Sequence, residues 1–179
     1  MKNEEVILVD ENDSPTGVAE KMAAHLEAKL HRAFSIFIFN SEGKMLLQQR
    51  ALSKYHSGGL WTNACCSHPI PGESTLAAAN RRLNEELGFE TPIEKAFDFV
   101  YKAKFENGLT EYEFDHVFVG EFDGEIVFNK DEVMELSFES ISSIKELMFK
   151  NPEQYTVWFQ IAFPKVEAWW NEQTKNKVA

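Results

Sequence analysis

One amphipathic helical stretch lies between segments with β-strand character, and this order constrains the possible folds most strongly. Apolar residues at helical intervals predict a helix over Ser74–Leu87: Leu76, Ala79, Leu83 and Leu87. Gly88 follows as a typical C-terminal stop. A helix inserted between antiparallel hairpins indicates an α+β fold or an α/β/α sandwich rather than a Rossmann sheet.

Runs of β-branched and aromatic residues predict the strands around this helix. The expected strands are 6–9, 32–39, 44–50, 97–105, 111–122 and 133–138, with one more after the Asp123-Gly124 turn. Turns at 40–43 and at Asn107-Gly108 are expected to close two hairpins. Residues 10–17 and 51–63 are expected to be loops. Two helices are expected near the end of the chain, 140–150 and 153–174, separated at Asn151-Pro152.

Length and composition narrow the class of protein. The chain has 179 residues, 44% of them hydrophobic, and no linker or repeat divides it. We therefore expect a single domain over residues 1–179, with its core at about 4–165. A formal net charge of −11 argues against nucleic acid and membrane surfaces as partners, because both are polyanionic. Two adjacent cysteines and the lack of a long apolar run favour a cytoplasmic protein.

The nine residues from Trp61 to Pro69 contain two adjacent cysteines and a histidine. If they form a strand, Cys66 and His68 point to one face and Cys65 points to the other. This alternation selects Cys66 as the thiol that lies beside a potential metal ligand. The residues alone equally allow a buried cysteine pair next to a core histidine, because free cysteine is among the most buried residue types.

The predicted helix and the residues before it resemble the Nudix box, G-x5-E-x7-R-E-U-x-E-E-x-G-U with U aliphatic. Five of its fixed positions match: Glu73, Arg81, Glu85, Glu86 and Gly88. Ser67 replaces the first glycine, and Arg82 replaces the first glutamate of the helix. In the usual box, three carboxylates on one helical face gather divalent metal ions for pyrophosphate hydrolysis. Arg82 argues against that hydrolysis and could itself contact a phosphate, whereas an Arg81–Glu85 ion pair on a solvated face is the plain alternative.

A second acidic pattern lies in the strand at 111–122. Glu111 and Glu113 share one face, where their repulsion would be removed by a divalent cation between them. Exposed strand carboxylates are more often simply solvated. A mixed set of histidines and glutamates suits Zn, Mn or Mg-like ions, and the nitrogen ligands favour transition metals.

With these residues the chain resembles the type I isopentenyl-diphosphate isomerases, the metal-dependent members of the Nudix superfamily. The matching segments cover about residues 4–165: Glu20-Lys21, His25, His31, Arg50–Lys54, Trp61–Asn63, Cys66–Pro69, the Nudix box, Tyr101, Glu111, Glu113 and Trp158. The resemblance implies the Nudix fold, with a mixed, largely antiparallel sheet and flanking helices. It also implies conversion of isopentenyl diphosphate to dimethylallyl diphosphate for isoprenoid biosynthesis, without flavin.

The same resemblance implies roles for the reacting and metal-binding residues. Cys66 and Glu113 would be the acid and base on opposite sides of the alkene, with Tyr101 hydrogen-bonded near the glutamate. One divalent ion, Mn, Zn or Mg, would be held by five residues: His25, His31, His68, Glu111 and Glu113. A second ion, Mg²⁺, would join the substrate diphosphate to Glu86 and to the Cys66 backbone.

The resemblance further implies which residues contact the substrate. The diphosphate would be bound by four basic residues: Lys21, Arg50, Lys54 and Arg82. Trp158 would place its ring against the carbocation, or would be a core aromatic residue. His56 and His116 match no ligand position and are expected to be structural.

Three functions remain open from the sequence. The isomerase uses every residue named above. A Nudix hydrolase would use Glu73, Glu85 and Glu86, but it is opposed by Arg82. A non-catalytic metal-binding module would need a broken acid–base pair, and both members of the pair are present. The expected partner is a small allylic or homoallylic diphosphate, and the protein is expected to be a monomer or a homodimer.

Overall fold

The computed structural model describes the backbone of residues 4–178 and the side chains of residues 4–175. The elements follow in this order: β1 (Glu5–Val9), β2 (Pro15–Glu20), α1 (Lys21–Leu26), β3 (His31–Phe39), β4 (Met45–Arg50), β5 (Trp61–Thr62), β6 (Cys65–Ser67), α2 (Thr75–Leu87), β7 (Ile93–Lys104), β8 (Thr110–Glu121), β9 (Val133–Glu139), α3 (Ile141–Lys150), η1 (Pro152–Gln154) and α4 (Val157–Val178). The single-domain expectation covers residues 1–179, of which 1–3 and 179 lie outside the described residues.

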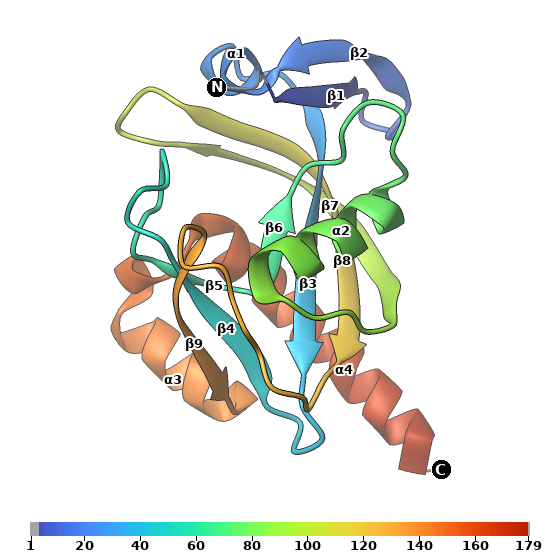
Figure 1. Ribbon diagram of the computed structural model, residues 1–179, viewed down its shortest axis with the longest axis vertical. Coiled ribbons are helices and arrows are strands. Elements are labelled where there is room, and N and C mark those ends of the chain that lie inside the picture. Colours follow the sequence, from blue (N-terminus) through green and yellow to red (C-terminus); the bar gives the residue numbers. More distant parts are fainter. Residues whose placement is uncertain (1–3, 179) are drawn as a thin grey trace.

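The strands form one mixed, largely antiparallel sheet, as the sequence predicts. Strands β2, β1, β3, β4 and β5 follow one another across it. β8 runs parallel to β3 and antiparallel to β7, and β9 is antiparallel to β4. The other pairings between named strands of the described chain are antiparallel. The parallel pair β3–β8 lies at the centre of Figure 1.

Helices cover both faces of this sheet, with α2 in front and α4 behind in Figure 1. The side chains of β3 alternate between the two layers. Phe34 and Ile36 belong to the apolar cluster that includes the buried face of α2. Phe37 and Phe39 belong to the cluster formed with α3 and α4. The predicted α/β/α sandwich is therefore confirmed.

The expected first hairpin closes only at its turn. Within the described chain, β3 and β4 pair at Phe39 and Met45. Further along, β6 pairs with β3, and β5 pairs with β4. The two strands thus diverge, and the segment Trp61–Ser67 crosses from one strand to the other. This arrangement carries Cys66 into the middle of the sheet, beside Ser35 of β3.

Three other elements differ from those expected from the sequence. The strand expected after Asp123-Gly124 is wrong, because residues 125–129 have no regular structure. Residues 15–20, partly expected as loop, pair with β1 as strand β2. Helix α1, which carries His25, was not expected at all. Both α1 and β2 are only six residues long, too short to show a clear period in the sequence.

The ends of α2 agree with the prediction. The Ser74 hydroxyl accepts a hydrogen bond from the Ala77 backbone N–H, which caps the first turn. Gly88 ends the helix in the left-handed region, at φ 71°. A Cβ at Gly88 would lie 2.3 Å from the Val127 carbonyl oxygen, so the following loop packs directly on the helix end. None of the helices within residues 4–178 combines the length and the apolar character that crossing a bilayer requires.

Candidate active site

A pocket opens where β3 and β4 diverge, and most of the residues singled out from the sequence line it. Its walls come from α1, β3, β6, β7, β8, α2, the first turn of α4, and the end of β4 with the loop that follows it. The lining residues are Lys21, Phe34, Ser35, Arg50, Lys54, Tyr55, His56, Cys66, Ser67, His68, Arg82, Tyr101, Glu111, Glu113 and Trp158.

Strand register places Glu113 between His31 and Tyr101. In the parallel pair β3–β8, Glu113 lies opposite His31, and in the antiparallel pair β7–β8 it lies opposite Tyr101. The Tyr101 hydroxyl donates to Glu113 Oε2 at 2.6 Å and also lies 3.0 Å from Glu111 Oε2. The two glutamates therefore share one phenol, and both point to the face of β8 that is covered by α4.

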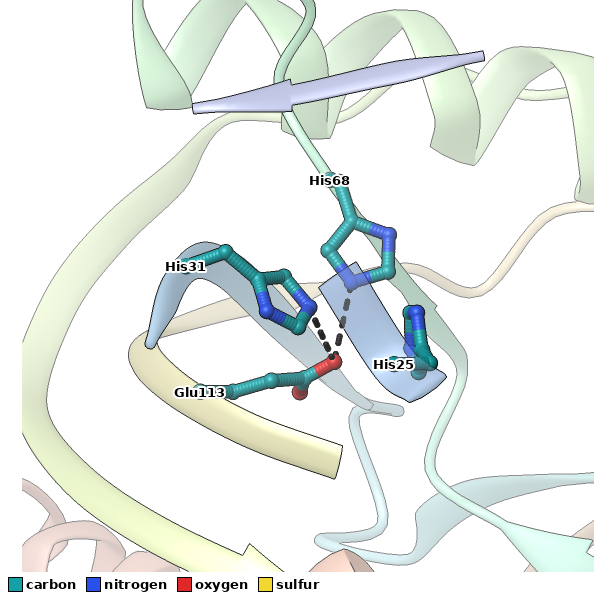
Figure 2. Close-up of side chains that lie close together, drawn as sticks. All are labelled: His25, His31, His68 and Glu113. Atoms are coloured by element: carbon teal, nitrogen blue, oxygen red, sulfur yellow. Dashed lines mark hydrogen bonds and ion pairs between the residues drawn. The ribbon is translucent and has the colours of Figure 1, made fainter. Parts of the chain in front are cut away.

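Three histidines surround the Glu113 carboxylate, as Figure 2 shows. His68 Nε2 lies 2.9 Å and His31 Nε2 lies 3.5 Å from Glu113 Oε1. One ligand atom from each of His25, His31, His68 and Glu113 lies within 4.8 Å of all the others. The structure thus brings together four of the five predicted metal ligands in one group, from α1, β3, β8 and the residue that follows β6.

The hydrogen bonds of these histidines fit a bound metal ion. Nδ1 of His25 lies 2.7 Å from the Lys21 carbonyl, and Nδ1 of His31 lies 2.8 Å from the Lys29 carbonyl. A carbonyl only accepts, so each Nδ1 carries the hydrogen and each Nε2 of the neutral ring has a free lone pair. Both Nε2 atoms are buried without a hydrogen-bond partner. Burial also lowers the pKa of His68 to about 3, which keeps its ring neutral.

The two glutamates differ in charge state because their neighbours differ. Burial and the nearby Glu113 charge raise the pKa of Glu111. Burial acts in the same direction on Glu113, but the nearby His31 and His68 rings outweigh it and lower its pKa. Glu113 is therefore the carboxylate of the pair that most readily stays ionised. It lies in the first histidine group, whereas Glu111 falls in a second group with His25 and His56.

Cys66 is held by two hydrogen bonds and lies beside the Ser35 hydroxyl. Trp158 Nε1–H donates to its sulfur at 3.1 Å, and the thiol donates to Asn63 Oδ1 at 3.0 Å. Ser35 Oγ lies 3.5 Å away, and it donates its own hydrogen to Asp115 at 2.7 Å. Burial and the Asp115 charge raise the pKa of Cys66 to about 12, so the sulfur keeps its proton.

The neighbouring cysteine has no part in this pocket. Cys65 is fully buried in the cluster formed with α2, on the opposite side of β6. Cys66 and His68 both line the pocket. Strand alternation therefore predicts which of the two cysteines lies in the pocket with His68, even though β6 is only three residues long.

Asn63 is oriented by the diverging strands. Its Nδ2 donates to the Ile36 carbonyl at 3.0 Å and to the Cys65 carbonyl at 2.9 Å, so Oδ1 must face Cys66 and Thr62. The Thr62 hydroxyl donates to this oxygen and accepts from the Thr156 hydroxyl at the start of α4. A fully buried chain of hydrogen bonds thus connects α4 to the thiol.

The family of this chain is shown by its relatives. The NUDIX domain family matches residues 29–159. An isopentenyl-diphosphate Delta-isomerase of Pectobacterium atrosepticum is 51% identical over 166 residues, which cover 93% of this chain and 93% of that protein. This chain belongs to the isopentenyl-diphosphate Delta-isomerase family of NUDIX-domain proteins. An isopentenyl-diphosphate Delta-isomerase 2 of Photorhabdus laumondii is also 47% identical over 172 residues, covering 93% of this chain and 97% of that protein.

Solved structures support the fold of this isomerase-family chain. A crystal structure of a Deinococcus radiodurans protein has a TM-score of 0.69 at 20% identity and covers 82% of this chain and 90% of that one. A MutT protein from Methanosarcina mazei has a TM-score of 0.64 at 20% identity, with 80% and 95% covered. The predicted Nudix fold is confirmed.

The cationic residues expected to bind diphosphate lie where the pocket meets an outer groove. Lys21, Lys54 and Arg82 line both hollows, together with His68. Each of the three is paired with carboxylates: Lys21 with Glu4, Lys54 with Glu132, and Arg82 with Glu85, Glu86 and Glu132. The cationic charge is thus largely balanced within the protein.

Glu86, Arg50 and Trp158 are more deeply placed. Glu86 is buried behind Arg82, which lies 2.5 Å from its Oε1, and Gln48 donates to its Oε2 at 3.2 Å. An ion at Glu86 would therefore share this carboxylate with Arg82 and Gln48 or compete with them for it. The Arg50 guanidinium lies 5.1 Å from the centre of the Trp158 ring. Trp158 is both a core residue of α4 and a wall of the pocket.

The two histidines that match no predicted ligand position lie in different surroundings in this isomerase-family structure. His116 Nε2 lies 2.9 Å from Asp13, and His116 does not line the pocket, which agrees with the expected structural role. His56 was also expected to be structural, but it lines the pocket, and its Nε2 lies 3.0 Å from Glu111 Oε1. The sequence offered one indication that His56 lies in the pocket: it follows Lys54 by two residues on the same loop. Asp115 was also missed, although it continues the alternation of Glu111 and Glu113.

Proposed function

We propose that this chain converts isopentenyl diphosphate to dimethylallyl diphosphate by adding a proton to the alkene and removing another. The observation that carries the proposal is one pocket lined by Cys66, Glu113 and His68, in which Glu113 and His68 also belong to a group with His25 and His31 that is suited to a metal ion. The relatives at 47–51% identity, which are isopentenyl-diphosphate Delta-isomerases, support the same function. The substrate is therefore a small diphosphate.

The charge states of the two reacting groups suit a proton transfer at each end. Burial raises the pKa of Cys66, so it begins the cycle with a proton that it can give. The pKa of Glu113 is lowered by its histidine neighbours, although burial opposes them, so it can accept a proton. Two groups whose environments push their pKa values apart are the usual basis of an acid–base pair. Tyr101 keeps the Glu113 carboxylate in place through its 2.6 Å hydrogen bond.

A divalent ion fits beside this pair. His25, His31, His68, Glu111 and Glu113 would hold it, and its positive charge would keep the glutamates ionised and oriented. Mn, Zn and Mg all remain candidates for this position, and we propose Mg²⁺ with the diphosphate, near Glu86 and the Cys66 backbone.

The rest of the pocket suits a cationic intermediate. Protonating an unactivated alkene gives a tertiary carbocation, which water would trap. Trp158 and Tyr101 are buried and give the pocket aromatic walls. An aromatic face stabilises a desolvated cation by about 2 kcal/mol or more. The basic residues Lys21, Arg50, Lys54 and Arg82 would anchor the diphosphate, which keeps the alkene beside Cys66 and Glu113.

Hydrolysis of a diphosphate is the competing function within the same fold. Arg82 is bonded to both Glu85 and Glu86, so two of the remaining Nudix-box carboxylates already have a cationic partner. Glu73 is likewise held by Arg81, at 2.8 and 2.9 Å. These pairs leave few free carboxylate oxygens to gather the metal ions that hydrolysis needs.

One assay distinguishes the functions. Purified protein with Mg²⁺ and isopentenyl diphosphate, and without flavin, should form dimethylallyl diphosphate and exchange substrate hydrogens with D₂O. Release of phosphate or diphosphate would instead indicate a hydrolase. Neither product, from protein that still binds a metal ion, would indicate a binding module.

A further inference from the structure

His56 is a buried histidine within the pocket that belongs to no predicted ligand set. Its ring stacks on Phe105 with a centroid distance of 4.9 Å and an interplanar angle of 14°. The rings of Tyr55 and Trp158 meet it edge-on, at 4.4 and 5.9 Å. Three aromatic neighbours thus fix the plane of the imidazole and leave its two nitrogens to make specific contacts.

The backbone that carries His56 is also fixed. Arg50 donates from Nε to the Ser57 carbonyl at 3.2 Å and from Nη2 to the His56 carbonyl at 3.3 Å. Ser57 adopts the left-handed conformation, at φ 52°, which a non-glycine residue adopts only when its surroundings stabilise it. A strained backbone, a buried ring and a cationic clamp together indicate that the position of this side chain is functionally important.

Both imidazole nitrogens have partners in this position. Nε2 lies 3.0 Å from Glu111 Oε1, and Nδ1 lies 3.2 Å from the Ser57 hydroxyl oxygen. When Glu111 is ionised, as a metal ligand must be, its oxygens only accept hydrogen bonds. Nε2 must then carry a hydrogen and donate it to Glu111. A nitrogen that carries a hydrogen has no lone pair for a metal ion.

Glu111 is consequently held at Oε1, where His56 donates. Its Oε2 lies 3.0 Å from the Tyr101 hydroxyl, whose single hydrogen is donated to Glu113. Glu113 is held by Tyr101 and by His68. The difference lies in the grouping of the possible ligand atoms: His68 belongs to the four-residue group with Glu113, whereas His56 forms a separate three-residue group with Glu111 and His25.

We propose that His56 is a positioning residue that fixes the Glu111 carboxylate for the metal ion, without binding the ion itself. The inference rests on the proposed metal site and deepens it by one residue. Hydrogen-bond partners of metal ligands typically change metal affinity by about 10- to 100-fold when they are removed. His56 supplies such a partner from the loop between β4 and β5, outside the strands that carry the glutamates.

Metal affinity in the absence of substrate tests this role. Co²⁺ would be titrated into metal-free protein, with its visible absorption and competition with a chelator as readouts. His56→Phe keeps the stacking on Phe105 but removes the donor, and it should weaken Co²⁺ binding by about tenfold or more and alter the absorption spectrum. His56→Gln keeps an N–H donor and should retain most of the affinity. His116→Gln, a remote histidine paired with Asp13, is the matched control and should bind like the wild type.

The outcomes separate the inference from the proposed function. Equal Co²⁺ affinity and equal spectra for His56→Phe and the wild type would overturn the positioning role while leaving the metal site intact. Equal losses in His56→Gln and His56→Phe would overturn it as well, because they would identify the ring as a ligand. A wild-type protein that fails to bind Co²⁺ would overturn the proposed metal site itself, and the inference with it.

Discussion

The pocket has a proposed acid–base end, around Cys66 and Glu113, and a cationic end, around Lys54 and Arg82, and the two ends are held by different forces. At the acid–base end, positions are set by strand register and by hydrogen bonds to backbone carbonyls and buried side chains. At the cationic end, long side chains are held in partly exposed ion pairs, with about a fifth of the Lys54 and Arg82 side chains accessible. Exposed ion pairs contribute little and rearrange easily. Thus one end is rigid and suited to chemistry, and the other is adaptable and suited to binding.

The largest effects are expected from the reacting groups at the acid–base end. Cys66→Ala and Glu113→Gln should each lower kcat by about 10²- to 10⁴-fold, because each removes a group that transfers a proton. The measurement is the rate of dimethylallyl diphosphate formation, together with thermal unfolding to verify the fold. Cys65→Ala is the matched control and should keep near-normal turnover. A folded but inactive Cys65→Ala protein would contradict the assignment of Cys66.

A smaller effect is expected from Asn63, which supports the thiol. Asn63→Ala leaves the Ile36 and Cys65 carbonyls without this donor, and it should destabilise the protein by about 1–3 kcal/mol. We also expect kcat to fall while KM changes little, because the thiol loses its acceptor. Urea unfolding and steady-state kinetics measure the two effects. Asn80→Ala, which removes one exposed helix-surface hydrogen bond, is the control. A rise in KM at constant kcat would contradict the proposal that Asn63 supports the Cys66 thiol, and would indicate a role in substrate binding instead.

At the cationic end, Lys54→Met should raise KM by about tenfold and leave kcat within a few-fold, because a charged contact to the diphosphate is lost. The effect should shrink as salt increases, since the side chain is partly exposed. Lys102→Met on β7, an exposed lysine outside the pocket, is the control. If kcat instead falls as steeply as it does in Cys66→Ala, the two ends of the pocket are not separable.

The smallest effect, and the only one of opposite sign, is expected from Glu132. This carboxylate pairs with both Lys54 and Arg82 and therefore competes with the diphosphate for them. Glu132→Gln should lower the dissociation constant for inorganic diphosphate by a factor of about two to five in calorimetric titration. Glu135→Gln, an exposed glutamate on β9, should have no such effect. Weaker binding by Glu132→Gln would show that Glu132 holds the cations in place rather than competing for them.

The same contrast explains how much could be predicted from the sequence. Cys66 and the Glu111/Glu113 pair follow from side-chain alternation, which is a local property of a strand. His25 and His31 required the family resemblance, because no local period connects α1 with the start of β3. The divergence of β3 from β4 could not be predicted, because the sequence of the two strands and the turn between them is typical of an ordinary hairpin. That divergence gives Asn63 its role, and the conformation of the following loop brings His56 to Glu111. These roles depend on long-range packing.

The parallel pairing of β3 with β8 has a consequence for how the protein folds. Ser35 and Asp115, which it brings together, are 80 residues apart in the sequence. Contacts between residues so far apart in the sequence form only after a long loop has closed. The entropy lost in closing that loop is offset only when the contacts form, and this slows folding. His31 and Glu113 lie on the same two strands, so a bound metal ion would join the ends of that loop. The metal-free protein is therefore expected to refold more slowly and to unfold at lower temperature than the metal-bound protein, with recovery of activity as the last event of refolding.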